Sequence, residues 1–157
     1  AKFRKGHFEG VLDVMDKLTK IVKPKKIFMG EKDFQQLYLV KKKLEKKYET
    51  KVIPCKTIRD RNNVALSSRN LLLNKYNLIM AAKIYEKLVD IKKCIKNKKN
   101  IRTFLNLQKK ELKDNYKIKI DYFELRNINN LKISSTTNNS RLFIAYYLNN
   151  VRLIDNL

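Results

Sequence analysis

The feature that most constrains the fold is a short apolar run, Ile-Phe-Met at residues 27–29, with a proline three residues before it and a glycine directly after it. A run this short between two such residues favours a buried strand over a helix. Amphipathic helical patterns flank the run at residues 10–23 and 34–48, and residues 51–58 form a second strand pattern. Helix, strand, helix and strand in this order predict a parallel α/β sheet.

The pattern changes after residue 70. Two helical patterns follow, from residue 75 to about 96 and from residue 101 onward, and Asn74 and Asn100 are candidate N-caps for them. Strands are then expected at residues 117–125, 131–134 and 141–148, the last extended by residues 151–154, with a polar turn at residues 136–140.

Helices followed by adjacent strands indicate a small α+β domain, here with an antiparallel sheet. We therefore expect two domains, residues 1–70 and residues 71–157, with the boundary near Leu71. The first offers two strands and two helices, whereas doubly wound domains use about five or six strands. The chain is thus either an unusually small protein or a part of a longer one.

Bulk composition limits the class of protein. At 157 residues and 43% hydrophobic, the chain can bury a core. No apolar run approaches the roughly 18 residues that span a bilayer, and no signal-peptide pattern is present. We expect a soluble, cytoplasmic protein with no membrane partner.

The net charge of +22 fits two interpretations. A nucleic-acid-binding module is one, since basic surfaces attract phosphate backbones. Compositional drift is the other, because most of the 37 basic residues are lysines spread along the chain, and arginine suits phosphate and base recognition better. We favour drift, with no specific nucleic-acid partner, and keep the basic nucleic-acid-binding module as the alternative function.

Metal binding has little support in this sequence. Cys55 and Cys94 lie far apart, without the spacing of a metal site or a disulfide framework, and His7 is the single histidine. Each cysteine is expected to be a small apolar residue that is buried or half-buried. No metal site is predicted in this chain.

Polar residues cluster directly after the first predicted strand, in the stretch Gly-Glu-Lys-Asp-Phe-Gln-Gln at residues 30–36. Local structure explains some of them: Asp33 and Gln36 can form a capping box, and Gly30 allows a tight turn. Lys32 is left unexplained, because a lysine beside a helix N-terminus is unfavourable with the helix dipole. An anion bound at the same place would account for it.

A second polar stretch, Ala-Leu-Ser-Ser-Arg-Asn at residues 65–70, follows the second predicted strand. Ser67, Ser68 and Arg69 can hold a phosphate, although a serine cap followed by a surface arginine explains the same residues. Successive parallel strands end at one edge of a sheet, where open α/β sheets bind ligands. Two loops that can each bind phosphate at that edge predict a nucleotide site.

Four stretches together resemble the pantoate–β-alanine ligase (pantothenate synthetase) family. They run in order over essentially the whole chain, and residues 30–36 argue against another adenylyl- or cytidylyltransferase of the same superfamily. The four stretches are Gly6-His7-Phe8, residues 30–36, residues 65–70 and Arg152-Leu153-Ile154-Asp155-Asn156.

The resemblance implies part of a nucleotidyltransferase-type Rossmann unit, followed by a lid domain that covers the site. It implies an AMP-forming ligase: pantoate and ATP give pantoyl adenylate and pyrophosphate, and β-alanine then displaces AMP to give pantothenate, a precursor of coenzyme A. Positioning, charge stabilisation and exclusion of water would drive such chemistry. It further implies ATP as a substrate, Mg²⁺ as a cofactor and a homodimer for the full-length enzyme.

The resemblance also implies roles for individual residues, each carried over by position. The catalytic and phosphate-binding residues would be Lys32, Ser67, Ser68 and Arg69. Gly30 and Asp33 would contact the ribose, backbone at Ile58 and Leu66 would flank the adenine, Gln36 with Arg4 and His7 would bind pantoate, and Val11, Val14 and Met29 would form an apolar wall. A structural role for His7 stays open.

Departures from the family pattern also matter. Lys5 stands where the family usually has proline, and Asn62-Asn63 stands where it has an Asp-Gly turn; asparagine tolerates the left-handed backbone nearly as glycine does. The family's His-x-Gly-His motif, its other pantoate-binding glutamine and its acidic magnesium ligands have no counterpart here. The chain therefore resembles the C-terminal part of the enzyme, and we expect it to have little or no ligase activity alone.

Overall fold

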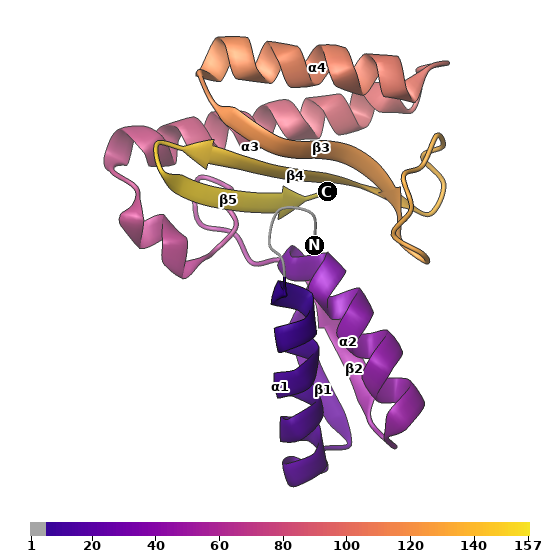
Figure 1. Cartoon of the computed structure of the whole chain (residues 1–157). Helices are drawn as coiled ribbons and strands as arrows, with labels where there is room; N and C mark the ends of the chain where they lie inside the picture. Colours follow the sequence, from indigo (N-terminus) through magenta and orange to yellow (C-terminus); the bar gives the residue numbers. More distant parts are fainter. Residues whose placement is uncertain (1–5) are drawn as a thin grey trace. The chain divides into compact units, whose positions relative to one another are not determined.

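The computed structural model describes residues 6–157, which form two compact units divided between Thr57 and Ile58 (Figure 1). The first contains a parallel two-stranded sheet and the second a separate antiparallel three-stranded sheet, so the predicted α/β class is confirmed. The functional domain boundary expected near Leu71 stays a prediction. Arg4 and Lys5 lie outside the described residues.

The first unit has the predicted order of elements. Its helices are α1 (His7–Val22) and α2 (Phe34–Lys47), its strands are β1 (Lys26–Gly30) and β2 (Lys51–Cys55), and the short 3-10 turn η1 (Glu31–Asp33) joins β1 to α2. The strands pair in parallel and in register over their whole length. The helix–strand–helix–strand prediction is therefore confirmed.

The residues after α1 explain why this helix ends. Lys23 adopts the left-handed conformation, with φ of 49°, and its N–H donates to the carbonyl of Thr19 at 2.9 Å. Pro24 follows and lacks the N–H that a further helical turn needs. The chain therefore leaves the helix and enters β1 within a few residues.

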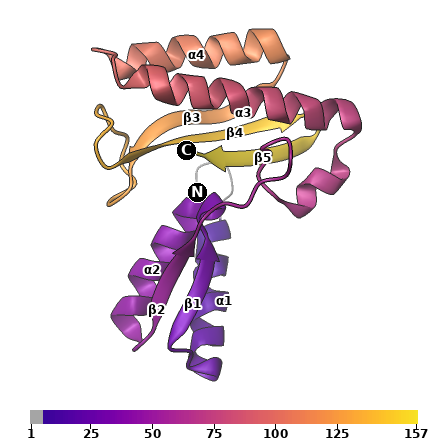
Figure 2. The same ribbon diagram turned by 180° about the vertical axis from the view of Figure 1, so that it is seen from behind.

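Both helices cover the same face of the two-stranded sheet (Figures 1 and 2). The core between them is small: Val40 and Leu44 of α2 are fully buried, and Val52 of β2 is nearly so. On the other face of the sheet, the side chain of Phe28 is 66% exposed. One face of this sheet thus lacks apolar cover from the described residues of the unit. The expectation of a buried strand at residues 27–29 is therefore wrong, because the residues of β1 alternate between exposed and half-buried.

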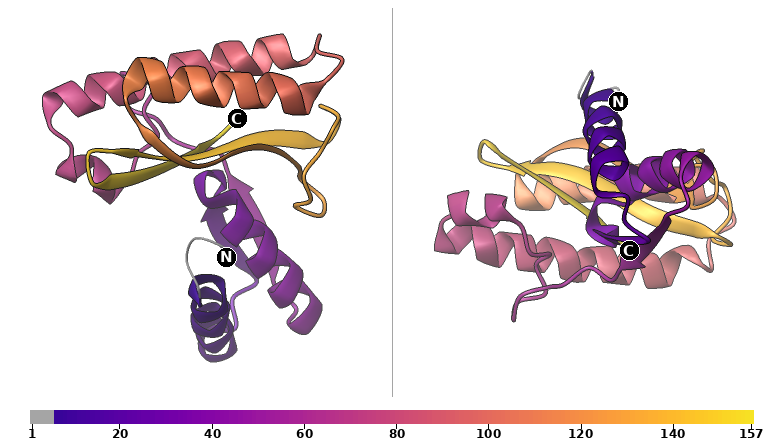
Figure 3. Two further views of the ribbon diagram at one scale, coloured as in Figure 1. Left: turned by 45° about the horizontal axis from the view of Figure 1, so that its top comes forward. Right: turned by 90° about the horizontal axis from the view of Figure 1, so that it is seen from below.

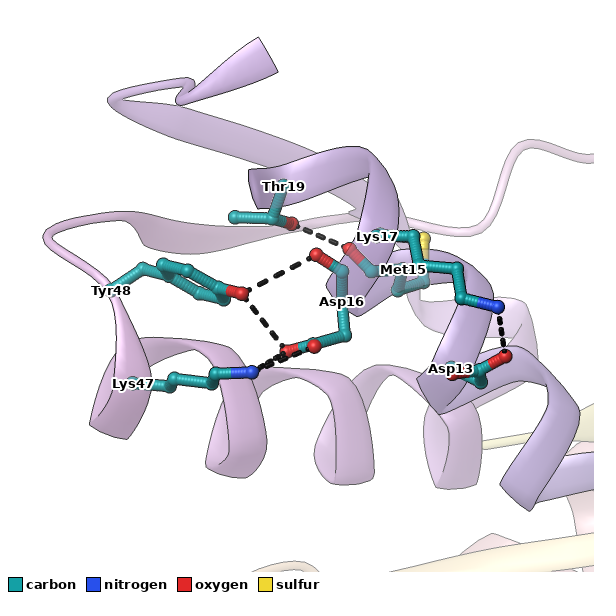
Figure 4. A network of polar contacts seen from close by, with 7 residues as sticks. All are labelled: Asp13, Met15, Asp16, Lys17, Thr19, Lys47 and Tyr48. Atoms are coloured by element: carbon teal, nitrogen blue, oxygen red, sulfur yellow. Dashed lines mark hydrogen bonds and ion pairs between the residues drawn. The ribbon is translucent and has the colours of Figure 1, made fainter. Parts of the chain in front are cut away.

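A polar contact between the middle of α1 and the C-terminal end of α2 joins these two helices (Figure 4). Lys47 Nζ donates to both carboxylate oxygens of Asp16, at 2.9 and 2.7 Å, and the Tyr48 hydroxyl donates to Oδ1 at 3.2 Å. The hydrogen bond from Lys47 lowers the pKa of Asp16. We call these three residues the Asp16 clasp.

The second unit is built from one 3-10 turn, two long helices and three strands. Its strands form an antiparallel sheet in the order β3-β4-β5, and α3 and α4 lie side by side over one face of it (Figures 1 and 3). The elements are η2 (Ser68–Leu72), α3 (Lys75–Ile95), α4 (Ile101–Tyr116), β3 (Lys119–Asn127), β4 (Ser140–Leu148) and β5 (Val151–Asn156).

The core of this unit lies between the helices and the sheet. Ile84 and Leu88 of α3, Leu112 of α4 and Ile144 of β4 are all at most 1% exposed. These residues follow the helical and alternating periodicities of the sequence, which place one apolar face of each element inward. The unit therefore closes a core from its own segments.

Side-chain caps fix the starts of both long helices, as predicted. The Asn74 side chain accepts the N–H of Asn77 at 2.8 Å, and the Asn100 side chain accepts the N–H of Thr103 at 3.0 Å. Each bond satisfies a backbone donor that has no partner inside the helix.

Three strand predictions need correction. Residues 151–154 do not extend β4; they belong to β5, which turns back at Asn149 (φ 51°) and pairs antiparallel with β4. Residues 131–134 contribute a single bridge, Arg126 to Ile133, because the segment leaves the sheet after one pair. β2 ends at Cys55, so the predicted strand to residue 58 is too long. Cys55 and Cys94 are both exposed, so the expectation that they are buried or half-buried is also wrong.

Candidate functional site

The stretch at residues 30–36 joins the end of β1 to the start of α2, as the sequence predicts. Asp33 occupies the N-cap position of α2, but its side chain makes no capping hydrogen bond. The predicted capping role of Asp33 is therefore wrong, because η1 intervenes between β1 and α2 and changes the backbone at this point. Its carboxylate Oδ2 lies 3.8 Å from Lys32 Nζ instead.

Gly30 does not need to be glycine for its backbone conformation. Its φ and ψ of −68° and 134° are ordinary extended values that any residue adopts. A Cβ built on Gly30 would meet no atom of the described residues within 4 Å. The tight-turn explanation for this glycine is therefore wrong, and the space beside it is open within the described chain.

Lys32 is held more firmly than a typical surface lysine. Its side chain is only 16% exposed, although the residue lies in a short turn between a strand and a helix. Lysine commonly packs its aliphatic stem while the ammonium reaches a polar site. The structure thus places one positive charge, with a packed stem, directly after β1.

The second polar stretch is preceded by a hydrogen-bonded loop at residues 58–66, which we call the 58–66 loop. The Leu66 N–H donates to the Ile58 carbonyl at 3.0 Å, and Asp60 Oδ1 accepts the N–H of Val64 at 2.9 Å. Asn63 has a φ of 63° at the turn. The prediction that asparagine can replace the glycine of this turn is therefore confirmed.

Ser67, Ser68 and Arg69 follow this loop and open η2. Ser67 Oγ accepts the N–H of Arg69 at 3.3 Å, so the serine-cap explanation holds for that hydroxyl. The side chain of Ser68 is exposed and that of Arg69 is half-buried. The stretch presents one exposed hydroxyl and one guanidinium, both next to a backbone turn.

Asn70 ties this stretch back to the 58–66 loop. Its Nδ2 donates to the Ala65 carbonyl at 3.0 Å, and its N–H donates to the Ser67 carbonyl at 3.0 Å. Its Oδ1 is buried and has no hydrogen-bond partner among residues 6–157. Asn70 therefore fixes the local backbone and leaves one acceptor unpaired in the described chain.

An ion pair that the sequence interpretation missed holds the 58–66 loop. Arg59 Nη1 and Nη2 donate to the two carboxylate oxygens of Asp155, at 2.7 and 2.9 Å. The guanidinium carbon lies 4.0 Å from the centre of the Tyr85 ring. Asp155 belongs to one of the family-like stretches, but residue pattern alone gave it no partner and no role.

The remaining predicted site residues lie in the first unit. His7 begins α1, with its ring centre 5.5 Å from that of Phe8, and Gln36 is half-buried in the first turn of α2. Val11 and Met29 pack against the small core, whereas Val14 is exposed. Arg4 lies outside the described residues, so its contact with pantoate stays a prediction.

The two polar stretches belong to different compact units. Lys32 follows β1 in the first unit, and Ser67, Ser68 and Arg69 lie in the second. Within each unit the structure brings the predicted residues of its own stretch together. Their convergence on one nucleotide stays a prediction.

The described residues contain neither a candidate metal site nor a helix that could span a membrane. No group of three or more His, Cys, Asp or Glu side chains in residues 6–157 is arranged to hold a metal ion. None of the helices in that range is both long and apolar enough to cross a membrane.

Comparison with known sequences gives one consistent relationship. The sequence model of the pantoate–beta-alanine ligase family matches residues 1–157. The chain is 38% identical over 160 residues to pantothenate synthetase of Flavobacterium psychrophilum, covering 99% of this chain and 56% of the relative. The chain thus spans about half the length of the curated relatives it matches.

Comparison with solved structures agrees with this relationship. The structure matches pantothenate synthetase from Thermus thermophilus with a TM-score of 0.89 and 28% identity, over 99% of this chain and 57% of that one. It also matches pantoate–beta-alanine ligase from Francisella tularensis, solved with beta-gamma ATP and beta-alanine, with a TM-score of 0.72 and 35% identity, over 99% and 52%.

Proposed function

The chain belongs to the pantoate–beta-alanine ligase family, and we propose that it supplies the part of such a ligase that binds the phosphates of ATP. In the first half-reaction, a carboxylate oxygen of pantoate attacks the α-phosphorus of ATP and pyrophosphate leaves. In the second, the amine nitrogen of β-alanine attacks the acyl carbon of the adenylate, AMP leaves, and the nitrogen loses a proton. The products are pantothenate, AMP and pyrophosphate.

The observation that carries this proposal is the family match over the whole chain, 1–157. The Francisella tularensis relative, 35% identical, was solved with an ATP-like molecule and β-alanine. Because this chain covers only about half of that protein, the complete reaction, its substrates and a homodimeric assembly are proposals here.

Phosphate binding is assigned to Lys32, Ser67, Ser68 and Arg69. The packed stem of Lys32 supports this, because a held ammonium loses less conformational freedom on binding than a mobile one. The exposed Ser68 hydroxyl and the Arg69 guanidinium are suitable donors to phosphate oxygens. These charges would stabilise the negative charge that develops on the leaving pyrophosphate.

Nucleoside binding is assigned to the backbone and side chains next to these donors. The Asp33 carboxylate makes no capping bond and can accept hydrogen bonds from ribose hydroxyls, and Gly30 has open space where a side chain would stand. The backbones of Ile58 and Leu66 lie side by side, joined by a hydrogen bond of 3.0 Å, so one adenine can contact both of them but cannot lie between them.

Pantoate binding is assigned to Gln36, with Arg4 and His7 as further candidates. Gln36 is half-buried at the start of α2, where its amide can both donate and accept. Val11 and Met29 offer apolar surface nearby in the same unit. Val14 is exposed and fits the proposed apolar wall less well than these two.

Magnesium is implied by the family resemblance but does not fit the described residues. They contain no group of three carboxylates, histidines or cysteines that could hold an ion. No step of the proposed reaction is therefore assigned to a metal held by this chain.

Titration calorimetry of ATP with the 157-residue chain tests the phosphate-binding proposal. Lys32→Ala should weaken ATP binding about 10-fold or more, because a hydrogen bond to a charged group contributes roughly 1.5–3 kcal/mol. Lys46→Ala is the matched control: it removes the same charge from an exposed lysine in the last turn of α2. Equal losses in the two variants would mean that ATP senses only the net charge, and the proposal would be wrong.

Activity of the chain alone provides a second measurement. We expect β-alanine-dependent AMP release far below that of a complete relative, because about half of the relatives' length is absent from the match. Turnover close to that of the Flavobacterium psychrophilum enzyme would contradict this expectation.

A further inference from the structure

Asp155 lies in an unusual place for a carboxylate. It sits on β5 two residues after the buried Leu153 and opposite the fully buried Ile144 of β4, so it shares the apolar, core-facing side of the sheet. Its side chain is only 10% exposed. A carboxylate there is strongly unfavourable unless a cation and hydrogen bonds compensate it.

Arg59 supplies that compensation. Its guanidinium donates one hydrogen bond to each carboxylate oxygen, at 2.7 and 2.9 Å, while the Asn156 N–H donates a further bond to Oδ1 at 2.8 Å. Burial lowers the pKa of Arg59, but the hydrogen bond and charge of Asp155 outweigh it and the net pKa is raised. The two-pronged geometry is specific to arginine.

The surroundings fix the orientation of the Arg59 guanidinium. Its carbon lies 4.0 Å from the centre of the Tyr85 ring, which projects from α3. Burial raises the pKa of Tyr146, which stays a neutral phenol beside the pair at physiological pH. A cation stacked on an aromatic face and bound by a fork of two hydrogen bonds has little rotational freedom.

The same guanidinium also holds the 58–66 loop together. Arg59 Nη1 donates to the Asn63 carbonyl at 3.1 Å, across the turn, and the Arg59 backbone forms a bridge to Ala65. Ala65 in turn accepts the Asn70 side-chain amide at 3.0 Å. A continuous set of contacts thus leads from Asp155 through Arg59 and Ala65 to the segment that contains Ser67, Ser68 and Arg69.

We propose that Arg59 and Asp155 are positioning residues: their ion pair holds the 58–66 loop on β5 and thereby fixes the Ser67–Arg69 segment for phosphate binding. This inference rests on the proposed function of that segment. It also gives a role to the Asp155 stretch, which has no place among the ligand-binding residues. We call the Arg59–Asp155 ion pair the anchor. η2 lies against β5, so the anchor and the Ser67–Arg69 segment belong to one packed region.

A second ion pair in the same sheet provides a matched comparison. Arg152 Nε donates to Asp121 Oδ2 at 2.8 Å, and the Asp121 side chain is 8% exposed. The Arg152 guanidinium lies 6.0 Å from the Tyr122 ring centre. This pair joins β5 to β3 with a similar residue set, but it holds two strands together rather than the 58–66 loop.

Hydrogen exchange of the whole 157-residue chain tests the anchor. Asp155→Asn should speed exchange of the Val64 and Leu66 amides about 10-fold or more, because opening of the loop exposes these hydrogen-bonded donors. Amides in the middle of α4 should change less than about 2-fold. Asp121→Asn should leave Val64 and Leu66 unchanged.

The Arg59→Lys variant allows the same hydrogen-exchange test if the Asp155→Asn protein does not fold. Lysine retains the charge but cannot form the two-pronged bond, so loop exchange should rise less than in Asp155→Asn but above that of the wild type. Unchanged loop exchange in Arg59→Lys and in any folded Asp155→Asn protein would overturn the anchor. Equal acceleration in the loop and in α4 would also overturn it, because the pair would then act only on global stability.

Inorganic pyrophosphate binding tests the second half of the inference. Asp155→Asn should weaken pyrophosphate binding about 5- to 10-fold while Asp121→Asn leaves it unchanged, with both measured by titration calorimetry. Absence of pyrophosphate binding in the wild-type chain would overturn the proposed phosphate site, whereas hydrogen exchange would still decide the anchor. Faster loop exchange with unchanged pyrophosphate affinity would overturn the positioning role.

Discussion

The two units of this chain differ in the size of their hydrophobic cores and in the kind of sheet on which each core is built. The first carries a two-stranded parallel sheet with helices on one face, and its core holds only the buried residues Leu37, Val40, Leu44 and Val52. The second carries a three-stranded antiparallel sheet joined by local turns and covered by two long helices. Large apolar side chains are exposed in both units: Val14, Leu18, Ile21, Val22 and Phe28 in the first, and Ile58, Leu71, Leu72 and Ile133 among others in the second.

The difference follows from how the strands are paired. Parallel sheets are normally covered on both faces, because each crossover places a helix against them, whereas an antiparallel sheet needs one covered face. The second unit covers one face of its sheet with its own helices and builds the larger core, whereas the described residues of the first unit leave the sheet face that carries Phe28 without apolar cover. We therefore expect the second unit to contribute most of the free energy of unfolding, although both units carry proposed ligand-binding residues.

Cavity-forming substitutions in the two cores should give the largest effects. Leu112→Ala, in the large core, should lower the free energy of unfolding by about 3–5 kcal/mol, and Leu44→Ala, in the small core, by about 2–3 kcal/mol. The smaller cluster has fewer neighbours to lose and more room to relax. Denaturant titrations followed through resolved amide signals of each unit would measure both values.

A leucine exposed on α4 provides the control for Leu112→Ala, which lies in the same helix. Leu107 of α4 is 61% exposed, so Leu107→Ala should change the free energy of unfolding by no more than about 0.5 kcal/mol. A larger loss for Leu44→Ala than for Leu112→Ala would reverse the comparison and place the main stability in the first unit.

Helix caps should give intermediate effects that again differ between the units. Asn74→Ala removes a capping bond of 2.8 Å from α3 and should lower the free energy of unfolding of the second unit by about 1 kcal/mol. Asp33→Ala removes a residue that occupies the cap position of α2 without a capping bond, so its effect should be less than half as large. Urea titration of the two variants measures this, and equal losses would show that Asp33 caps α2 in solution.

The sequence predicted elements well where one local signal was enough. The Asn74 and Asn100 caps and the apolar periodicity of α3 and α4 were identified because capping and helical spacing act within a few residues. β5 was missed because its turn at Asn149 contains no glycine or proline, although asparagine can adopt the left-handed conformation found there.

The candidate site shows the limit of this reasoning more clearly. The residues of each polar stretch were found from local chemistry, but the Arg59–Asp155 pair joins positions 96 apart and no spacing rule predicts such a contact. One signal was available: an aspartate among apolar strand residues of β5 requires a cation, and Arg59 directly follows Ile58, whose backbone was expected to flank the adenine. The prediction for Gly30 was wrong for the opposite reason: a glycine suggested a tight turn, but the backbone there is extended.

The smallest expected effect concerns the Asp16 clasp of the first unit (Figure 4). The hydrogen bond from Lys47 lowers the pKa of Asp16 from its ordinary value of 3.8, so the unfolded chain binds more protons than the folded one in acid. The stabilisation is complete above the unfolded pKa and is lost as the pH falls through the lower, folded pKa. The same pair raises the pKa of Lys47 above 10.5, so that contribution is complete below 10.5 and is lost at still higher pH.

Asp16→Asn should therefore flatten the fall in unfolding midpoint of the first unit as the pH drops below the ordinary Asp16 pKa of 3.8, with little change near pH 7 beyond the loss of one exposed pair. Asp13→Asn is the matched control, since Asp13 lies on the same helix and its ion pair with Lys17, at 2.9 Å, joins two residues of that helix. Urea titrations at several pH values would resolve the difference. If Asp13→Asn flattened the profile as much as Asp16→Asn, the acid sensitivity would come from general charge on α1, and the clasp between α1 and α2 would contribute nothing specific.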